Sequence, residues 1–298
     1  MDARIKDLLK PEILNTVNGL ELIARVIVEG FMSGSNTSQT IGIGQEFSQY
    51  RSYQPGDDLR QLDWKMFGRT ERYYIKQAEV ETNITVKFML DASASMDYRE
   101  NGLSKLQLAK ILIAALAYLA RRQSDTFGLY VINNDQVQYI EPRFEQQQFH
   151  RLLYTLVQTQ ATSTWTKAGS NDHLYNHHGK ELIVFITDLY DDQRDLQQFI
   201  NRIKTTRNEV VVLHLMGEQE LLLNYEGAFT FQDIETGERV KVNTREQQAL
   251  YKQKITDWLQ QCRSWMLEKQ IGYQLITMNT PAEQALYAFL KARKHVGR

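Results

Sequence analysis

From residue 84 onward, short runs of β-branched and aromatic residues alternate with longer segments whose apolar residues recur every three or four positions. Continuous apolar runs are typical of strands buried on both faces, and the longer period is typical of helices that cover such strands. This alternation predicts an α/β fold with a mostly parallel central sheet and helices on both faces.

The predicted elements can be placed by residue number. The predicted strands cover residues 84–91, 126–133, 136–140, 181–188, 209–216 and 272–278. The predicted helices cover residues 103–122, 144–158, 192–205, 244–269 and 281–294. Pro281 suits the start of the last helix, because the first turn needs no N–H from that residue.

Two segments lie outside this alternation. Residues 228–243 hold two short alternating runs around Gly237, which predicts a small β-hairpin insertion, either a partner-binding arm or a cover for a sheet edge. Before residue 84, a helix over about residues 10–32 is followed by a stretch too polar to form a core. We therefore expect residues 1–83 to form an N-terminal extension and residues 84–298 to form the main domain.

Composition narrows the class of protein. The 298 residues include 35 basic and 36 acidic ones, so the chain has no overall charge that would attract nucleic acid. Its one cysteine, Cys262, permits no disulfide within the chain. The first residues show no signal-peptide pattern, and the longest apolar run, residues 111–120, is shorter than the roughly 20 residues that span a membrane. We expect a cytoplasmic protein with no transmembrane segment and no nucleic-acid partner.

The first predicted strand ends in an acid followed by two hydroxyls at alternate positions. Alternate side chains of an extended chain point to the same side, so Asp91, Ser93 and Ser95 can direct their oxygens into one volume. Asp188 ends another predicted strand, and the carboxyl ends of parallel strands meet at one edge. Such oxygens suit Mg²⁺, which makes a metal site one interpretation and simple turn and helix capping the other.

Three blocks of sequence carry a resemblance to a known family. The first and most specific runs from Gly44 to Thr70 and includes Arg51-Ser-Tyr-Gln-Pro-Gly-Asp-Asp58. The second, Asp91-Ala-Ser-Ala-Ser-Met96, is similar to the first loop of a metal-ion-dependent adhesion site. The third, a weaker match, begins at Phe231. Together they resemble the MoxR-associated proteins with a von Willebrand factor A-like domain, long catalogued as a domain of unknown function.

The resemblance implies a Rossmann-like fold of the von Willebrand factor A type, with Mg²⁺, or alternatively Mn²⁺ or Ca²⁺, at the carboxyl edge of the sheet. The metal ligands that it implies, from three loops, are Asp91, Ser93, Ser95, Thr164 and Asp188. In the second loop the chain departs from the family's Gly-Thr pattern, so Thr162 and Thr166 remain alternatives to Thr164.

The resemblance also implies a MoxR-type AAA+ ATPase as a partner, together with a client protein that the sequence does not name. A dication with few anionic ligands favours a visiting carboxylate, so we expect a metal-dependent protein–protein interaction module, an adaptor or co-chaperone in the assembly or maturation of other proteins. The alternatives are a metal-free scaffolding protein and a metal-dependent phosphohydrolase. We expect no enzyme, because Ser93 stands where a phosphatase of the haloacid dehalogenase type needs a second acid.

Two other polar clusters have a structural and a functional interpretation. One is the set of charged residues close to Trp64, namely Arg51, Asp57, Asp58, Arg60 and Asp63. We expect these residues to form ion pairs that hold the N-terminal extension in place, with Trp64 packed beside them and partner docking as the alternative. The other cluster is His173, His177 and His178, for which we expect an exposed polar loop in preference to a Zn²⁺ site.

Overall fold

The structure is a computed structural model that describes residues 9–35, 50–54, 57, 62–76, 84–133, 137–165, 180–190, 193–225 and 227–296. The chain forms two compact units. The main unit comprises Met1–Phe31 and Asn83–Arg298, and the small unit comprises Met32–Thr82. Most of helix α3 (Val17–Ser35) therefore belongs to the main unit, whereas the sequence grouped it with the extension.

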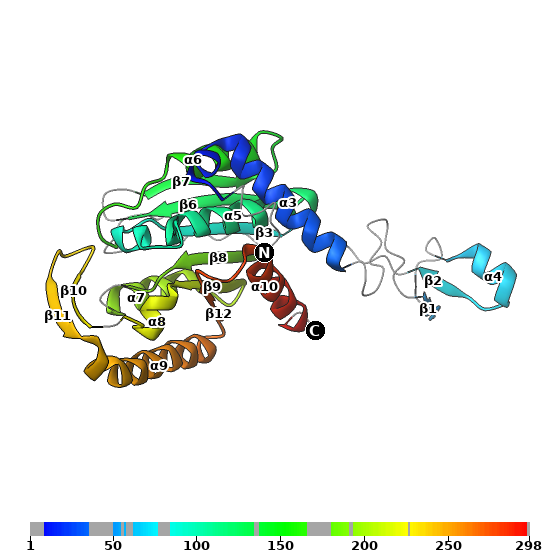
Figure 1. Ribbon diagram of the computed structural model, residues 1–298. Coiled ribbons are helices and arrows are strands. Elements are labelled where there is room, and N and C mark those ends of the chain that lie inside the picture. Colours follow the sequence, from blue (N-terminus) through cyan, green and yellow to red (C-terminus); the bar gives the residue numbers. More distant parts are fainter. Residues whose placement is uncertain are drawn as a thin grey trace. The chain divides into compact units, whose positions relative to one another are not determined.

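A six-stranded sheet forms the centre of the main unit (Figure 1). Its strands, in chain order, are β3 (Thr85–Asp91), β6 (Thr126–Ile132), β7 (Val137–Arg143), β8 (Glu181–Thr187), β9 (Asn208–Met216) and β12 (Gly272–Thr277). Across the sheet they lie in the order β12-β9-β8-β3-β6-β7, and every neighbouring pair is parallel except β6 with β7. Counted along the chain, this is the order 3-2-1-4-5-6 of doubly wound α/β folds.

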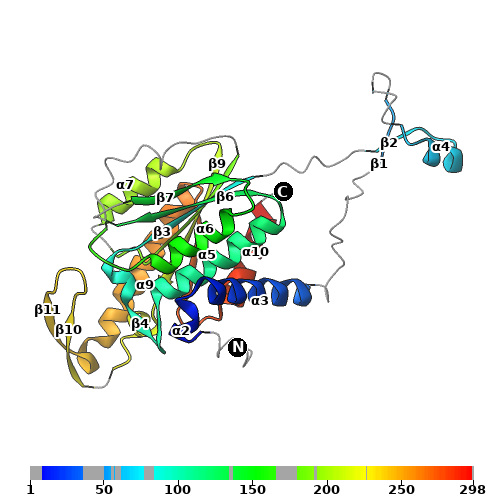
Figure 2. The ribbon, with the colours of Figure 1, turned by 90° about the horizontal axis from the view of Figure 1, so that it is seen from above.

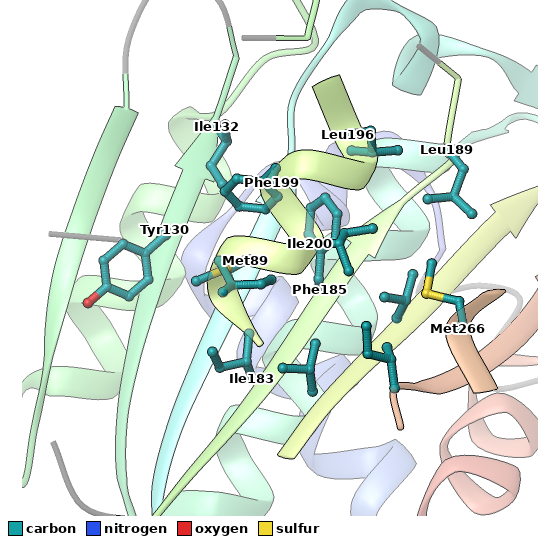
Figure 3. Close-up of a cluster of buried hydrophobic side chains, with 14 of the residues drawn as sticks. Met89, Tyr130, Ile132, Ile183, Phe185, Leu189, Leu196, Phe199, Ile200 and Met266 are labelled. Atoms are coloured by element: carbon teal, nitrogen blue, oxygen red, sulfur yellow. The ribbon is translucent and has the colours of Figure 1, made fainter. Parts of the chain in front are cut away.

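Helices cover both faces of the sheet (Figures 1 and 2). On one face lie α5 (Lys105–Arg122), α6 (Gln148–Gln158) and α10 (Ala282–Val296), and on the other lie α7 (Gln193–Ile203) and α9 (Thr244–Glu268). Successive side chains of a buried strand point to opposite faces and must be apolar on both. In β3, for example, Phe88 faces α5 and α10, while Met89 belongs to the cluster on the α7 face (Figure 3).

Helix α5 is enclosed by its neighbours. Ser104 begins it with a capping box, because its hydroxyl accepts from the Gln107 N–H while the Gln107 side chain accepts from the Ser104 N–H. Thirteen of its 18 residues are buried, among them Lys105 and Lys110. Burial on nearly all sides explains the unbroken apolar run within this helix, and it carries the Lys105 ammonium group into the interior.

The remaining elements are short. In the main unit they are α2 (Pro11–Leu14), the 3-10 helix η2 (Ala94–Asp97), β4 (Arg99–Glu100), β5 (Leu103–Ser104), α8 (Glu218–Leu222), β10 (Ala228–Gln232) and β11 (Arg239–Asn243). The small unit contains β1 (Tyr50–Ser52), α4 (Trp64–Thr70) and β2 (Tyr74–Lys76), with β1 and β2 antiparallel.

The predicted α/β class is confirmed: the main unit has a Rossmann-like architecture, with a mostly parallel sheet between two helical layers. The predicted insertion at residues 228–243 is the hairpin of β10 and β11, with Phe229 opposite Val242. The sequence did not predict α4, α8 or η2, since each is too short to show a helical period.

Gly128 allows β7 to pair with β6. The register between these strands shifts at this point, and a Cβ atom on residue 128 would lie 2.5 Å from the Ile140 carbonyl oxygen and 2.7 Å from the Pro142 nitrogen. Both of these atoms are backbone, so they cannot move aside as a side chain can.

Replacing Gly128 with alanine is therefore expected to lower the free energy of unfolding by about 1–3 kcal/mol, measured by urea denaturation. Gly30→Ala is the matched control, because its added Cβ in α3 would meet no described atom within 4 Å apart from the neighbouring backbone of its own helix. That helical substitution should raise stability by up to about 1 kcal/mol. Equal effects of the two substitutions would contradict the role given to Gly128.

Candidate functional site

The two predicted acids lie at the point where the strand order reverses. Asp91 is the last residue of β3, and Asp188 directly follows β8. These strands are parallel neighbours, with Leu90 paired to Ile186, so both carboxyl groups reach the same edge. In doubly wound sheets this switch point is where ligands bind.

A chain of side-chain oxygens joins the two acids. The Ser93 N–H and hydroxyl both donate to Asp91 Oδ1, at 2.9 and 2.7 Å. The Ser93 and Ser95 hydroxyl oxygens are 3.0 Å apart, and the Ser95 hydroxyl lies 3.2 Å from its acceptor, Asp188 Oδ1. All four side chains are buried. The structure therefore brings together four of the five predicted ligands. These four residues, Asp91, Ser93, Ser95 and Asp188, are here called the oxygen cluster.

Thr187 adds a member that the sequence did not single out. Its hydroxyl donates to Asp91 Oδ2 at 2.7 Å and accepts from the Leu189 N–H. The Ser93 hydroxyl also donates its proton to Asp91. The Ser95 hydroxyl therefore has a single proton for two neighbouring acceptors, Ser93 Oγ and Asp188 Oδ1. The cluster has more acceptor oxygens than protons, which suits a cation.

The charge of Asp91 is poorly compensated. Burial, and then the negative charge of Asp188, raise the pKa of Asp91 to about 7, although hydrogen bonds from Thr187 and Ser93 lower it in part. Among the described residues, no cationic side chain forms an ion pair with this carboxyl group. A cation bound beside Asp91 would offset the cost of burying its charge.

Asp188, in contrast, has a cationic partner that the sequence analysis missed. Lys105 Nζ lies 2.9 Å from Asp188 Oδ2 and 2.7 Å from Glu220 Oε1 of α8, and it sits 5.0 Å from the centre of the Tyr98 ring. Burial alone would lower the pKa of Lys105, but Asp188 and Glu220 raise it above the ordinary value, so the ammonium group stays charged. Only Asp188 Oδ1 is left to face the oxygen cluster.

His214 on β9 fixes the backbone of Asp188. Burial lowers the pKa of His214 to about 4, so the ring is neutral near pH 7. Its Nε2 lies 3.0 Å from the Asp188 carbonyl oxygen, which can only accept, and therefore Nε2 carries the proton. Nδ1 then accepts from the Tyr273 hydroxyl at 2.7 Å.

The second loop packs on the first through its backbone. The Thr162 N–H donates to the Ala92 carbonyl, and the Ala94 N–H donates to the Ser163 carbonyl. The Thr162 hydroxyl accepts from the Asn133 side chain at 3.2 Å. Thr164 is exposed, and within the described parts of the chain no hydrogen bond joins it to the oxygen cluster. Thr166 lies outside the described residues.

Two of the three loops contain a non-glycine residue with left-handed backbone. Ser163 has a φ of 63° and Leu189, directly after Asp188, has a φ of 53°. Such conformations cost of order 1–3 kcal/mol each and collect at binding and catalytic sites. Their presence on both sides of the cluster is consistent with a functional edge.

The other candidate clusters have separate outcomes. His173, His177 and His178 lie outside the described residues, as do Asp58 and Arg60. In the part of the chain that the structure describes, no group of three or more His, Cys, Asp or Glu side chains is placed to hold a metal, so an ion at the oxygen cluster would depend on hydroxyl ligands.

In the small unit, the acids close to Trp64 serve the local backbone. Asp63 caps α4 by accepting from the Lys65 and Met66 N–H groups, and Asp57 accepts from the Gln54 N–H. Trp64 is 64% exposed, so the expectation that it packs beside the charged residues is wrong.

Comparisons with known proteins add relatives of unknown function. An uncharacterised protein of Mycobacterium bovis and one of Mycobacterium tuberculosis are each 25% identical to this chain over 239 residues, covering 78% of this chain and 74% of the relative.

Three solved structures are similar in part. The conserved hypothetical protein BatB of Bacteroides thetaiotaomicron is 15% identical, with a TM-score of 0.45, over 70% of this chain and 98% of its own. An aerotolerance-related membrane protein of Bacteroides fragilis is 18% identical, with a TM-score of 0.41 and the same coverage. A von Willebrand factor type A structure from Catenulispora acidiphila is 10% identical, with a TM-score of 0.32, over 48% of this chain and 34% of its own.

The predicted cytoplasmic location is corrected by these comparisons, because one of the similar structures is described as a membrane protein. We assign no location to this chain. None of the helices in its described parts combines the length and the apolarity that crossing a membrane requires.

The family itself is shown by sequence. The model of the family described as "Protein of unknown function DUF58" matches residues 49–257, which is more than half of the chain. The match takes in β1, α4 and β2 of the small unit and the oxygen cluster of the main unit. The chain therefore belongs to the DUF58 family.

Proposed function

We propose that this protein is a non-catalytic protein-interaction module whose binding edge is the oxygen cluster of Asp91, Ser93, Ser95 and Asp188. The acceptor-rich chain between two buried acids is the observation that carries the proposal. Mg²⁺ held by these side chains, with Mn²⁺ or Ca²⁺ as alternatives, would offer a free coordination position to an acidic residue of a partner protein.

The residues present fit such an ion. Asp91 is the one acid of the cluster whose charge lacks a cationic partner among the described residues, and its pKa is raised to about 7 as a result of burial. Ser93 and Ser95 supply neutral oxygens at the same point. Backbone hydrogen bonds hold Thr162 and Ser163 of the second loop against the first loop, so we propose this part of the loop in place of Thr164 as the source of a further ligand.

The partner class comes from the resemblance to MoxR-associated proteins. It supports a MoxR-type AAA+ ATPase as the partner, and a role as adaptor or co-chaperone in the assembly or maturation of a client protein. A phosphohydrolase is less well supported, because the Ser93 hydroxyl occupies the place beside Asp91 where a second acid is required.

A metal-free scaffolding protein is the second candidate, and Lys105 is the observation that favours it. The side chains of Lys105 and Asp188 are only 3% and 1% exposed, so their ion pair already supplies a buried positive charge at this edge. In that case Asp91 would remain protonated over much of the neutral range, and the cluster would serve only to hold the loops together.

Calorimetric titration with MgCl₂ separates these candidates. The wild-type chain is expected to release or absorb heat, and Asp91→Asn is expected to lose the signal because it removes the one uncompensated carboxylate. Since the pKa of Asp91 is about 7, protons compete with the ion, and affinity should rise from about pH 6 to about pH 8. The matched control is Asp97→Asn, an exposed acid of η2 paired with Arg99. Equal heats in all three proteins would remove the metal site.

Urea denaturation of Lys105→Met tests the buried ion pair. The substitution leaves the Asp188 carboxylate buried without its partner, so the free energy of unfolding should fall by about 3–5 kcal/mol in the absence of metal. Arg99→Met breaks an exposed pair and should cost at most about 1 kcal/mol. If the oxygen cluster holds an ion, MgCl₂ should restore part of the loss; a loss that MgCl₂ leaves unchanged would favour the metal-free scaffold.

Co-purification with a MoxR-type ATPase tests the partner. Wild-type chain should retain the ATPase in MgCl₂ and lose it in EDTA, and Asp91→Asn should fail in both buffers, whereas Asp97→Asn should behave as wild type. Retention that does not depend on EDTA or on Asp91 would move the binding surface away from this edge.

A further inference from the structure

The hairpin of β10 and β11 is a two-stranded sheet of its own. Its strands pair with each other and, in the described residues, with no other strand. Figures 1 and 2 show the hairpin standing away from the central sheet. None of the residues in its two strands is buried. A sheet of only two strands needs a third strand or a packing partner to be stable in water.

The hydrogen bonds at the two ends of the hairpin show which backbone groups of β10 have no partner in β11. The Asp233 N–H donates to the Glu238 carbonyl, and the Thr244 N–H donates to the Gly227 carbonyl. Hydrogen-bonded and non-hydrogen-bonded pairs alternate along an antiparallel ladder. The N–H and C=O groups of Thr230, and those two residues away on either side, therefore point away from β11. Among the described residues no backbone hydrogen bond is made to this outer edge of β10.

The outer edge of β10 lacks the features that keep an exposed strand from pairing. The strand, Ala-Phe-Thr-Phe-Gln, contains no charged residue and no proline, and its pairing with β11 contains no bulge. Natural proteins place such features on exposed edges to prevent pairing with another chain. Strand β11 differs, because it carries Arg239 and Lys241. A row of free backbone donors and acceptors is matched by an added β-strand.

One face of the hairpin is apolar. Phe229 lies opposite Val242 and Phe231 lies opposite Val240, which places these four side chains on the same face. Tyr225 covers part of this face, with its ring centroid 5.2 and 5.6 Å from those of Phe229 and Phe231. Phe229 and Val240 are still 40% and 57% exposed. An added strand would extend this face if every second residue were apolar.

The opposite face of the hairpin is basic. Thr230 lies opposite Lys241, and Gln232 lies opposite Arg239. The Arg239 Nε donates to Gln232 Oε1 at 3.2 Å, so the Arg239 side chain crosses from β11 to β10. A strand added beside β10 would place its polar side chains on this face, next to the cation.

The acids of the hairpin do not neutralise this face. Asp233, Glu235 and Glu238 lie in the turn between the two strands. The Asp233 carboxylate accepts from N–H groups of that turn. In the part of the chain that the structure describes, neither Arg239 nor Lys241 forms an ion pair with a carboxylate. Charge complementarity therefore favours acids among the polar residues of an added strand.

We infer that the outer edge of β10, here called the β10 edge, binds an extended segment of a partner protein in which apolar residues alternate with acids. Backbone hydrogen bonds make this segment the third strand of the hairpin. Its apolar side chains continue the face of Phe229 and Phe231, and its acids lie on the face of Arg239. A second copy of this chain is a poorer match, because its β10 carries no acid to place beside Arg239. The inference goes beyond the proposed function and requires no metal at the oxygen cluster.

Binding of synthetic strands to the full chain tests the inference. The probe is a fluorescein-labelled peptide of about eight residues in which valine alternates with glutamate, titrated in EDTA and followed by fluorescence anisotropy. Wild-type chain is expected to bind it, with an affinity that falls as NaCl is raised. Two control peptides should bind at least about tenfold more weakly. One alternates valine with lysine, and the other has the composition of the probe with all valines before all glutamates.

Two pairs of variants locate the binding site. Thr230→Pro removes an outward N–H of β10 without removing a hydrogen bond to β11, so it should weaken binding by about tenfold or more. Thr230→Val keeps the N–H and should bind within about twofold of wild type. Arg239→Gln should weaken binding and reduce its dependence on NaCl, whereas Arg239→Lys should retain most of both. The comparison of peptides uses wild-type chain and does not depend on how the variants fold.

Absence of binding by wild-type chain, equal binding of the three peptides, or full binding by Thr230→Pro would each overturn the inference. A wild-type dimer in analytical ultracentrifugation that Thr230→Pro converts to a monomer would also overturn it, because a second copy would then occupy the β10 edge. Failure of the proposed metal site would leave the inference standing, since the titrations are made in EDTA.

Discussion

The cost of burying two carboxylates at the end of adjacent strands is the constraint on which this edge of the molecule depends. The ammonium group of Lys105 offsets that cost for Asp188. For Asp91, the described residues supply only hydroxyl and N–H donors. Neutral donors compensate a buried charge incompletely, which is why the pKa of Asp91 is raised to about 7. A bound ion, a proton or a positively charged group of a partner protein is needed to compensate the remaining negative charge of Asp91.

The fold provides the geometry for this arrangement. Because β3 and β8 are parallel neighbours at the reversal of strand order, their connections leave toward opposite faces of the sheet, and Asp91 and Asp188 lie at the point between them where doubly wound sheets bind ligands. Elements distant in sequence then close in around it: α5 contributes Lys105, α8 contributes Glu220, and β9 contributes His214. The hairpin of β10 and β11 reaches the same region, since the Tyr190 hydroxyl donates to Asp233 in its turn.

Much of this arrangement could be predicted from sequence, for a physical reason. Continuous apolar strands and periodic helices identify the sheet, and an acid at the end of each of two strands identifies the edge, so Asp91, Ser93, Ser95 and Asp188 could be grouped before any coordinates were known. Lys105 could not be included, because a lysine in the first turn of a helix has no local mark of burial. Thr187 could not be assigned to the site either, because in the sequence it is an ordinary strand residue. The family resemblance implies Thr164 as the metal ligand of the second loop. The backbone hydrogen bonds to the first loop, however, are made by Thr162 and Ser163.

The small unit also has features that could not be predicted from the sequence. Asp57 and Asp63 accept from backbone N–H groups, a role that the pattern of charges in the sequence did not indicate, and Trp64 and Tyr73 are exposed. The sequence can predict that Asp residues cap backbone N–H groups. Which Asp carboxylates do so depends on turns that the sequence does not specify.

The most direct test of the central claim is an anomalous difference map from crystals grown with MnCl₂. The account predicts a peak within coordination distance of Asp91, Ser93, Ser95 and Asp188, with Lys105 still on the far oxygen of Asp188. A map with no peak at this edge, while the same hydrogen bonds link Asp91, Ser93, Ser95 and Asp188, would contradict it.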